Sequence, residues 1–193
     1  MSSKSRDKHI PTLVKVFRNS GYDGASVAQI SKATGLGKAS LYHHFPGEKE
    51  EMMSCVLEFL SDRLKNTAIK ALQSEGTVGD RFAKMSEALM SIYDGGKEPC
   101  ILAIVLLGNA QDTFQQQIQD SFQLWLDAMS KALQESGIDP TQAQMKSEEI
   151  AIGVQGSLII AQALNDPTVF HRFIQSLPQK VQKGQCSKGK GQR

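Results

Sequence analysis

The chain has 193 residues, of which 40% are hydrophobic and 22% are charged, and its 22 Lys and Arg nearly balance 20 Asp and Glu. This composition is typical of a globular protein with one or two domains, and it excludes a disordered or fibrous chain. Residues 100–107 form the longest apolar run, far below the roughly 20 residues that span a bilayer, and no apolar signal segment follows Met1.

Charge is unevenly distributed along the chain. Residues 1–47 hold seven basic and two acidic side chains, residues 48–179 hold ten basic and eighteen acidic ones, and residues 180–193 hold five basic ones and no acid. A basic first quarter indicates a polyanionic partner for that part of the chain. The Lys- and Gly-rich end, residues 184–193, lacks an apolar anchor and is predicted to be a disordered basic tail.

The first 47 residues predict three helices. Apolar residues at helical spacing favour a helix over residues 8–20, which Gly21 ends. Ser26 and Gln29 have the spacing of a capping box and open a short second helix. After a tight turn, a third helix covers residues 38–45. A longer helix followed by two short ones has the dimensions of a helix-turn-helix.

The rest of the chain is also predicted to be helical, because glycine and proline punctuate it at helical intervals and no alternating strand pattern lies between them. Six helices are expected, over residues 48–72, 80–93, 100–110, 112–136, 141–165 and 167–178. The predicted fold is all-α with about nine helices. It divides into a helix-turn-helix domain over residues 1–47 and a second domain over residues 48–183, and the helix over 48–72 connects the two.

The predicted helix over residues 38–45 has the properties of a DNA-reading helix. A major groove admits one α-helix, and side chains on its outer face reach base edges. Leu41 and Phe45 lie on the inward face. The residues expected to face outward are Lys38, Ala39, Tyr42 and His43. Of these, Lys38 can donate to a guanine edge and Ala39 can contact a thymine methyl, while the partner expected for Tyr42 is either a base or a phosphate. The residues better placed for backbone phosphates are Ser40 and His44.

The segment from Gly21 to Glu50, with Leu-Tyr-His-His-Phe followed by Pro-Gly-Glu-Lys, resembles the DNA-binding domain of the TetR family of transcriptional regulators. The resemblance covers about the first 55 residues, and the Phe-Pro-Gly-Glu-Lys part is similar to the LmrA-type branch. It implies phosphate contacts from Tyr42, His44, Lys49 and Ser26 or the N–H groups beside it. Many relatives place Ser or Thr where this chain has Gly37, a weaker helix cap.

Lys49 is informative by its position in the first turn of a predicted helix. A cation there opposes the helix dipole, but it becomes favourable when a phosphate docks at the same N-terminus. The alternative is that Lys49 pairs with a neighbour such as Glu50 on a solvated face.

The resemblance also implies a cavity for a small hydrophobic or aromatic effector among the middle helices. Met and aromatic residues are abundant there, and most of them are expected to be core. The residues predicted to line the cavity are Phe82, Met85, Leu89, Cys100, Ile104, Leu107, Phe122, Trp125 and Met129.

The two last predicted helices have the composition of a dimer interface. Small residues on one side allow another helix to approach closely, and isoleucines make a neighbouring side apolar. Together they favour a two-fold dimer built as a four-helix bundle. A wholly intramolecular helix is the alternative. The predicted interface residues are Ile152, Gly153, Gly156, Ile159, Ile160, Ala163, Phe170 and Phe173.

No catalytic, nucleotide-binding or metal-ligating motif is present. Adjacent His43 and His44 point about 100° apart on a helix and cannot easily share one ion, and three dispersed cysteines favour reduced thiols. We therefore expect a cytoplasmic, homodimeric DNA-binding regulator that is not an enzyme and needs no cofactor. It would be a repressor of operator DNA that a small hydrophobic effector releases. The alternative is an all-helical small-molecule carrier without specific DNA binding.

Overall fold

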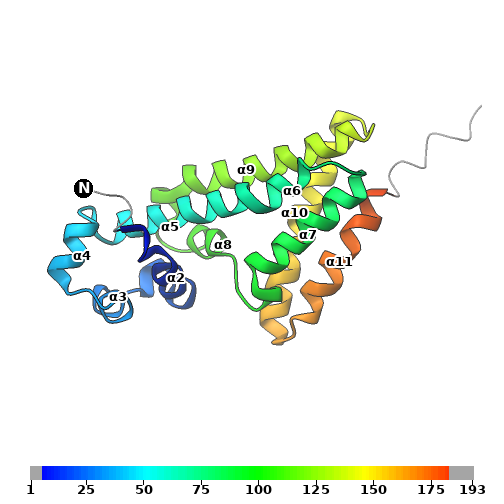
Figure 1. Ribbon diagram of the computed structural model, residues 1–193. Coiled ribbons are helices and arrows are strands. Elements are labelled where there is room, and N and C mark those ends of the chain that lie inside the picture. The colour runs from blue at the N-terminus through cyan, green and yellow to red at the C-terminus, as the bar shows by residue number, and fades with distance from the viewer. Residues whose placement is uncertain (1–5, 183–193) are drawn as a thin grey trace, which may run out of the picture. The chain divides into compact units, whose positions relative to one another are not determined.

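The computed structural model describes residues 6–182, and the predicted basic tail over residues 184–193 lies outside this range. The helices in chain order (Figure 1) are α2 Ile10–Gly24, α3 Val27–Thr34, α4 Lys38–His44, α5 Glu48–Leu64, the π-helical turn η1 Lys65–Ile69, α6 Lys70–Leu72, α7 Val78–Ile92, the short 3-10 turn η2 Asp94–Gly96, α8 Ile101–Leu106, α9 Gln111–Glu135, α10 Pro140–Leu164 and α11 Thr168–Gln182.

The all-helical prediction is confirmed. Within residues 6–182 no β-strand is present, and α5, η1 and α6 follow one another without a break, so they form the single helix predicted over residues 48–72. Counted in this way, the described range contains nine helices besides the short turn η2. None of the helices within this range is long and apolar enough to cross a membrane.

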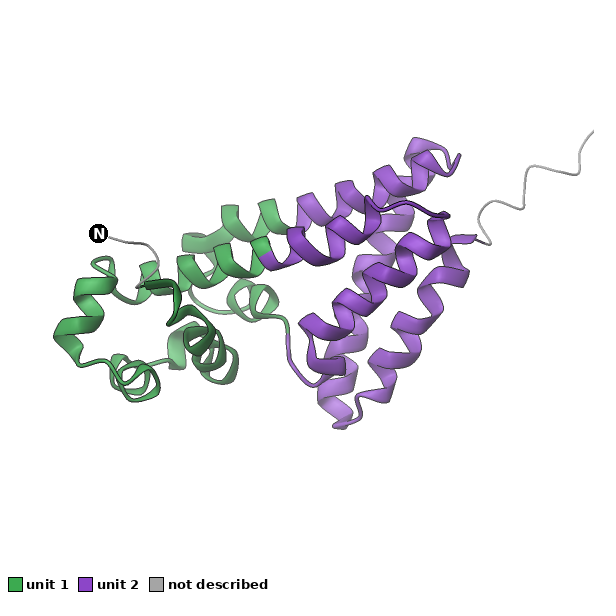
Figure 2. Cartoon of the chain, viewed as in Figure 1, with its two compact units in different colours: residues 1–62, 100–121 green, residues 63–99, 122–193 purple. Residues whose placement is uncertain are grey.

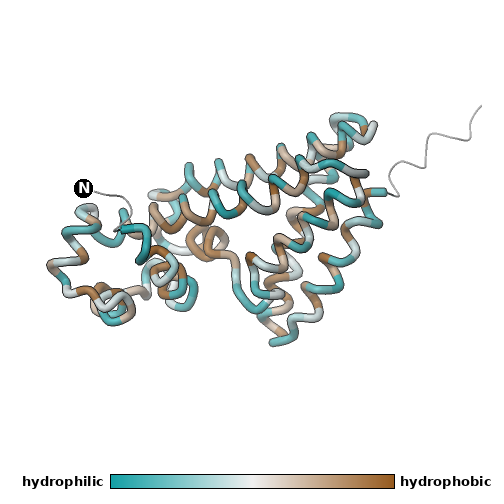
Figure 3. The backbone as a smooth tube through the Cα atoms, viewed as in Figure 1, coloured by the Kyte–Doolittle hydropathy of each residue, from teal (hydrophilic) through white to brown (hydrophobic). Residues whose placement is uncertain are grey.

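The chain divides into two compact units (Figure 2). Unit 1 comprises residues 1–62 and 100–121, and unit 2 comprises residues 63–99 and 122–193, as far as each is described. Unit 1 thus holds the three predicted helices of the first 47 residues together with α8 and the start of α9. Figure 3 shows the short α8 as a strongly hydrophobic segment, and within unit 1 it packs against α2.

The helix-turn-helix part of unit 1 folds as its local sequence requires. Gly21 interrupts α2 with a φ of 66° and a ψ of 177°, a conformation that a glycine adopts without strain, and Gly35 ends α3 in the left-handed helical region with a φ of 69°. Pro11 lies in the first turn of α2, where a backbone N–H has no carbonyl partner within the helix, so the lack of one in proline costs little. The side chains that fill the core between these helices are fully buried: Leu13, Phe17, Ile30, Leu41 and Phe45.

Unit 2 is built around α7, α10 and α11. α11 extends to Gln182, although the sequence predicted its end near Pro178. Pro178 cannot donate to the carbonyl of Ile174, four residues earlier, but that carbonyl accepts a hydrogen bond from Ser86 Oγ of α7 at 3.2 Å. A neighbouring helix thus supplies a donor to the carbonyl that the proline leaves without one.

Candidate nucleic-acid interface

The N-terminus of α3 is held by the predicted capping box. The Gln29 N–H donates to Ser26 Oγ at 3.2 Å, and the Ser26 N–H donates to Gln29 Oε1 at 2.8 Å. Ser26 is exposed on the surface of unit 1. The first N–H groups of a helix lack carbonyl partners within it, so this terminus presents donors that suit an anion.

Two side chains of α3 hold the turn between α3 and α4, and the first is Thr34, whose hydroxyl accepts the Leu36 N–H at 3.4 Å. The Ser31 hydroxyl donates to the carbonyl oxygen of Leu36 at 2.6 Å, across the turn that begins at Gly35. Gly37 precedes α4 in an extended conformation and gives it no side-chain cap, as expected for glycine. The orientation of α4 therefore depends on the turn and on its buried face.

α4 presents the outward face that the sequence predicted. Leu41 and the following Phe45 have no exposed surface. On the other side of the helix Lys38, Ala39 and His43 are exposed, while Ser40, Tyr42 and His44 are partly exposed. Lys38 Nζ lies 5.6 Å from the centroid of the Tyr42 ring, so these two side chains share one face at the spacing of one helical turn.

His44 lies in a row of three imidazoles at the end of α4. The His44 ring centroid is 5.7 Å from that of His9, at the start of α2, and 5.8 Å from that of His43. Burial, followed by the charges of Lys8 and His44, lowers the pKa of His9. Among the described residues no group of three His, Cys, Asp or Glu side chains has the arrangement of a metal site.

Lys49 is held by a residue that the sequence did not indicate. Its Nζ donates to the carbonyl oxygen of Tyr22 at 2.9 Å and lies 4.4 Å from the centroid of the Tyr22 ring. The sequence predicted either a phosphate or Glu50 as the partner of Lys49, and Tyr22 is neither of them. The two residues are 27 positions apart, so no local spacing could have shown it.

Acidic residues occupy the first turn of α5. Glu48, Glu50 and Glu51 all lie there, and Glu51 accepts the Gly47 N–H at 2.8 Å. Arg6 forms an ion pair with the same Glu51 carboxylate at 3.2 Å. This carboxylate thus accepts a donor just before the helix and lies near the positive end of the helix dipole, a role that the sequence did not indicate.

Comparisons with known proteins place this geometry in a family. Residues 12–54 match the model of the bacterial regulatory proteins of the tetR family, and residues 80–176 match the model of the transcriptional regulator LmrA/YxaF-like C-terminal domain. The chain belongs to the TetR family of transcriptional regulators. TetR-family proteins are DNA-binding regulators and not enzymes, which confirms the predicted class and removes the carrier as the alternative.

Relatives of this TetR-family chain are similar along most of its length. The HTH-type transcriptional regulator LmrA of Bacillus subtilis is 18% identical over 90% of this chain and 95% of its own. The biofilm operon icaADBC HTH-type negative transcriptional regulator IcaR of Staphylococcus aureus is 28% identical over 74% of this chain and 76% of its own. A TetR transcriptional regulator from Legionella pneumophila has the same fold, with a TM-score of 0.78, 19% identity and coverage of 93% and 97% of the two chains.

The nine residues predicted for an effector cavity are divided between the two units of this TetR-family chain. Cys100, Ile104 and Leu107 belong to unit 1, and Leu107 is 83% exposed because α8 ends before it. The six members in unit 2 are Phe82, Met85, Leu89, Phe122, Trp125 and Met129. All of these except the partly exposed Phe122 are buried, and the Trp125 Nε1–H has no hydrogen-bond partner among the described atoms.

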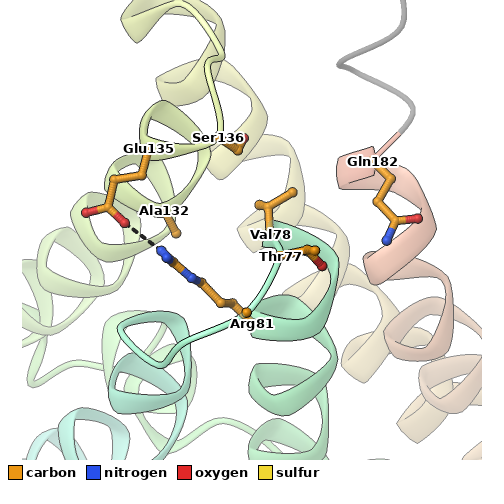
Figure 4. Close-up of a pocket in the computed structure, with 8 residues that line it drawn as sticks. Thr77, Val78, Arg81, Ala132, Glu135, Ser136 and Gln182 are labelled. Carbon is orange, nitrogen blue, oxygen red and sulfur yellow. Dashed lines mark hydrogen bonds and ion pairs between the residues drawn. The ribbon is translucent and has the colours of Figure 1, made fainter.

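A cavity of about 530 Å³ lies elsewhere in unit 2, where α7 begins and α9 and α11 end (Figure 4). The ion pair between Arg81 and Glu135 spans one side of it. None of its lining residues was predicted: Gly76, Thr77, Val78, Arg81, Ala132, Glu135, Ser136 and Gln182.

The predicted dimer residues divide into an exposed and a covered set. The exposed ones on α10 are Ile152, Ile159, Ile160 and Ala163, with open space around Gly156. Gly153 is instead covered by the Phe173 ring of α11, which a Cβ at that position would meet at 2.0 Å. Phe170 is fully buried against Gly96 and Tyr93, so its side chain cannot reach a second chain.

Proposed function

We propose that this TetR-family regulator is a cytoplasmic repressor that binds operator DNA as a homodimer and is released by a small hydrophobic effector. The observation that carries the proposal is the outward face of α4, where Lys38 and Tyr42 lie together on the side opposite the buried Leu41. The name of IcaR, a negative transcriptional regulator, supports repression. In this proposal residues 1–47 read DNA, and residues 48–183 bind the effector and the second copy.

The proposed contacts with DNA divide by chemistry. Lys38, Ala39, Tyr42 and His43 would meet base edges from the exposed face of α4. Phosphates would be held by Ser40, His44 and Lys49 and by the first N–H groups of α3 beside Ser26. The contacts with bases select a sequence, whereas those with phosphates fix the helix in the groove.

The proposed dimer rests on an apolar stripe along the exposed side of α10. Met145, Ile152 and Ile159 follow one another at seven-residue spacing and are all exposed, and Ile160 and Leu164 extend the stripe. From first to last the stripe is about 29 Å long, at a rise of about 1.5 Å per residue. Exposed Glu148 and Glu149 lie between Met145 and Ile152, but from Ile152 to Leu164 the helix carries no charged side chain, and an exposed apolar surface of this kind favours a protein partner over water. A second copy covers it symmetrically and supplies two reading helices for two half-sites.

The proposed effector site uses the buried apolar residues of unit 2. Met85 and Met129 can adapt their side chains to a ligand, and Trp125 offers an unpartnered N–H. The effector would release DNA only by binding more tightly to a conformation in which the two reading helices no longer fit successive grooves. The helix over residues 48–72, which begins in unit 1 and ends in unit 2, would carry this difference.

The test begins with selection of genomic fragments that the protein retains at physiological salt. The proposal expects a shared palindromic sequence with half-sites about one helical turn apart, and twice the monomer mass in sedimentation. A screen of hydrophobic small molecules should then find compounds that release these fragments. Retention without any shared sequence, or a monomer bound to the selected site, would contradict the proposal.

A further inference from the structure

Lys49 has two contacts with one residue, and both fix the position of its ammonium group. The carbonyl oxygen of Tyr22 accepts one of its N–H donors, and the face of the Tyr22 ring lies under the same nitrogen. An ammonium has three donors, and a ring face attracts a cation without using up all of them. A donor therefore remains for a phosphate oxygen.

Tyr22 is itself fixed from several directions within unit 1. Its ring is stacked on that of Phe17, with centroids 6.3 Å apart, and meets the Phe114 ring of α9 edge-on at 5.3 Å. Both partner rings are buried. The next residue, Asp23, accepts the Asn109 N–H at 3.1 Å, so the backbone beside the Tyr22 carbonyl is also anchored.

The surroundings of Lys49 explain why such anchoring matters. Glu48, Glu50 and Glu51 lie in the same first turn of α5 and attract a mobile ammonium away from DNA. A lysine side chain also loses rotamer freedom when it is immobilised by a partner. Contacts that hold Lys49 before DNA arrives reduce that loss on binding.

We propose that Tyr22 is a positioning residue for DNA binding. Its carbonyl and ring hold the Lys49 ammonium ready for a phosphate, and Phe114 of α9 holds the ring in place. The inference rests on the proposed phosphate contact of Lys49, and it makes DNA affinity depend on an aromatic residue that touches no DNA.

The experiment is a double-mutant cycle with Tyr22→Leu and Lys49→Met, measured as affinity for a 30-base-pair duplex of mixed sequence over a series of salt concentrations. Lys49→Met is expected to weaken binding at low salt and to reduce the salt slope by about one. Tyr22→Leu should weaken binding about fivefold when Lys49 is present, and have no further effect in the Lys49→Met background. Tyr22→Phe, which keeps both the carbonyl and the ring face, should restore the affinity.

The outcomes separate this inference from the proposed function. Equal losses from Tyr22→Leu in both backgrounds would show that Tyr22 acts only through the fold, which overturns the inference and leaves the Lys49 contact standing. An unchanged affinity and salt slope for Lys49→Met would remove Lys49 from the proposed contacts, and the role of Tyr22 with it. If thermal unfolding shows that Tyr22→Leu does not fold, Phe114→Leu is measured in the same two backgrounds, with a smaller loss expected only when Lys49 is present.

Discussion

α4 and α10 are each anchored by a buried apolar face, but their outward faces differ in chemistry. α4 is anchored by Leu41 and presents Lys38 and His43 to solvent, whereas α10 is anchored by residues such as Val154 and presents Ile152. Water solvates the face of α4 well, and it solvates that of α10 poorly. The difference agrees with the proposed roles, in which α4 remains uncovered until DNA arrives and α10 is covered by a second copy at all times.

The largest expected effect comes from a charge placed in the stripe on α10. Ile152 is 71% exposed in the single chain, so Ile152→Glu should leave the fold of the monomer intact. In a two-fold dimer the substitution buries two unpaired carboxylates, and we expect the dimer dissociation constant to rise by about a thousandfold or more. Sedimentation over a range of concentrations measures this.

The matched control is Gln119→Glu, which adds the same charge at an exposed position on a different helix, α9. It should leave self-association unchanged. An unchanged dimer dissociation constant for Ile152→Glu would show that α10 is not the interface and that the two copies meet through another surface.

Phe45→Ala tests the other side of the comparison, the anchoring of α4. The Phe45 ring is fully buried at the end of this helix, and its removal from the core is expected to cost about 3–5 kcal/mol. DNA binding should be lost, while the self-association that we propose through α10 should persist. Denaturant unfolding, gel shift and sedimentation measure the three quantities.

Leu41→Met is the control in the same core, because it conserves volume and should cost less than about 1.5 kcal/mol. If Phe45→Ala binds DNA as the unchanged chain does, the buried face of α4 does not set the orientation of its outward face.

The parts of the structure that the sequence predicted correctly are those that local spacing controls. The capping box joins Ser26 and Gln29, which are three positions apart, and Gly21 and Gly35 interrupt or end a helix through their own backbone angles. Leu41 and Phe45 follow helical periodicity. Such features depend on neighbours in the chain, so one sequence is enough to identify them.

The contacts that sequence reasoning missed join distant residues. Lys49 meets Tyr22 across 27 positions, and Arg6 meets Glu51 across 45. The bond from Ser86 to the carbonyl that the proline of α11 leaves without a donor spans 88 positions. Phe170 was predicted as an interface residue from the composition of the last two helices, yet only the packing of unit 2 shows that its ring faces inward.

Lys38→Ala is expected to have an intermediate effect, confined to sequence discrimination. Lys38 is exposed beside Tyr42 on the outward face of α4, where a lysine can donate to a guanine edge. Its loss should reduce the preference for operator over random DNA by about 1–3 kcal/mol. Competition binding with the selected operator and a scrambled duplex measures this preference.

Lys15→Ala serves as the control, since Lys15 is also exposed but lies on α2. It should leave the preference unchanged. Equal losses on operator and random DNA for Lys38→Ala would assign Lys38 to a phosphate and transfer sequence reading to its neighbours on α4.

The smallest effect concerns the start of α4, which differs from the starts of α3 and α7. Those helices have complete capping boxes, at Ser26 and at Thr77, whereas Gly37 offers α4 no side-chain acceptor. Gly37 has a φ of −64° and a Cβ there would meet nothing within 4 Å, so serine fits without strain. Gly37→Ser should raise the free energy of unfolding by a few tenths of a kcal/mol, because the hydroxyl can accept a first-turn N–H. Gly37→Ala should lower it, because the alanine methyl shields those N–H groups from water and, like glycine, gives them no acceptor. Denaturant unfolding of the three proteins measures the order, and equal stabilities for the Ser and Ala variants would show that the turn closed by Ser31 fixes α4 without help from a cap.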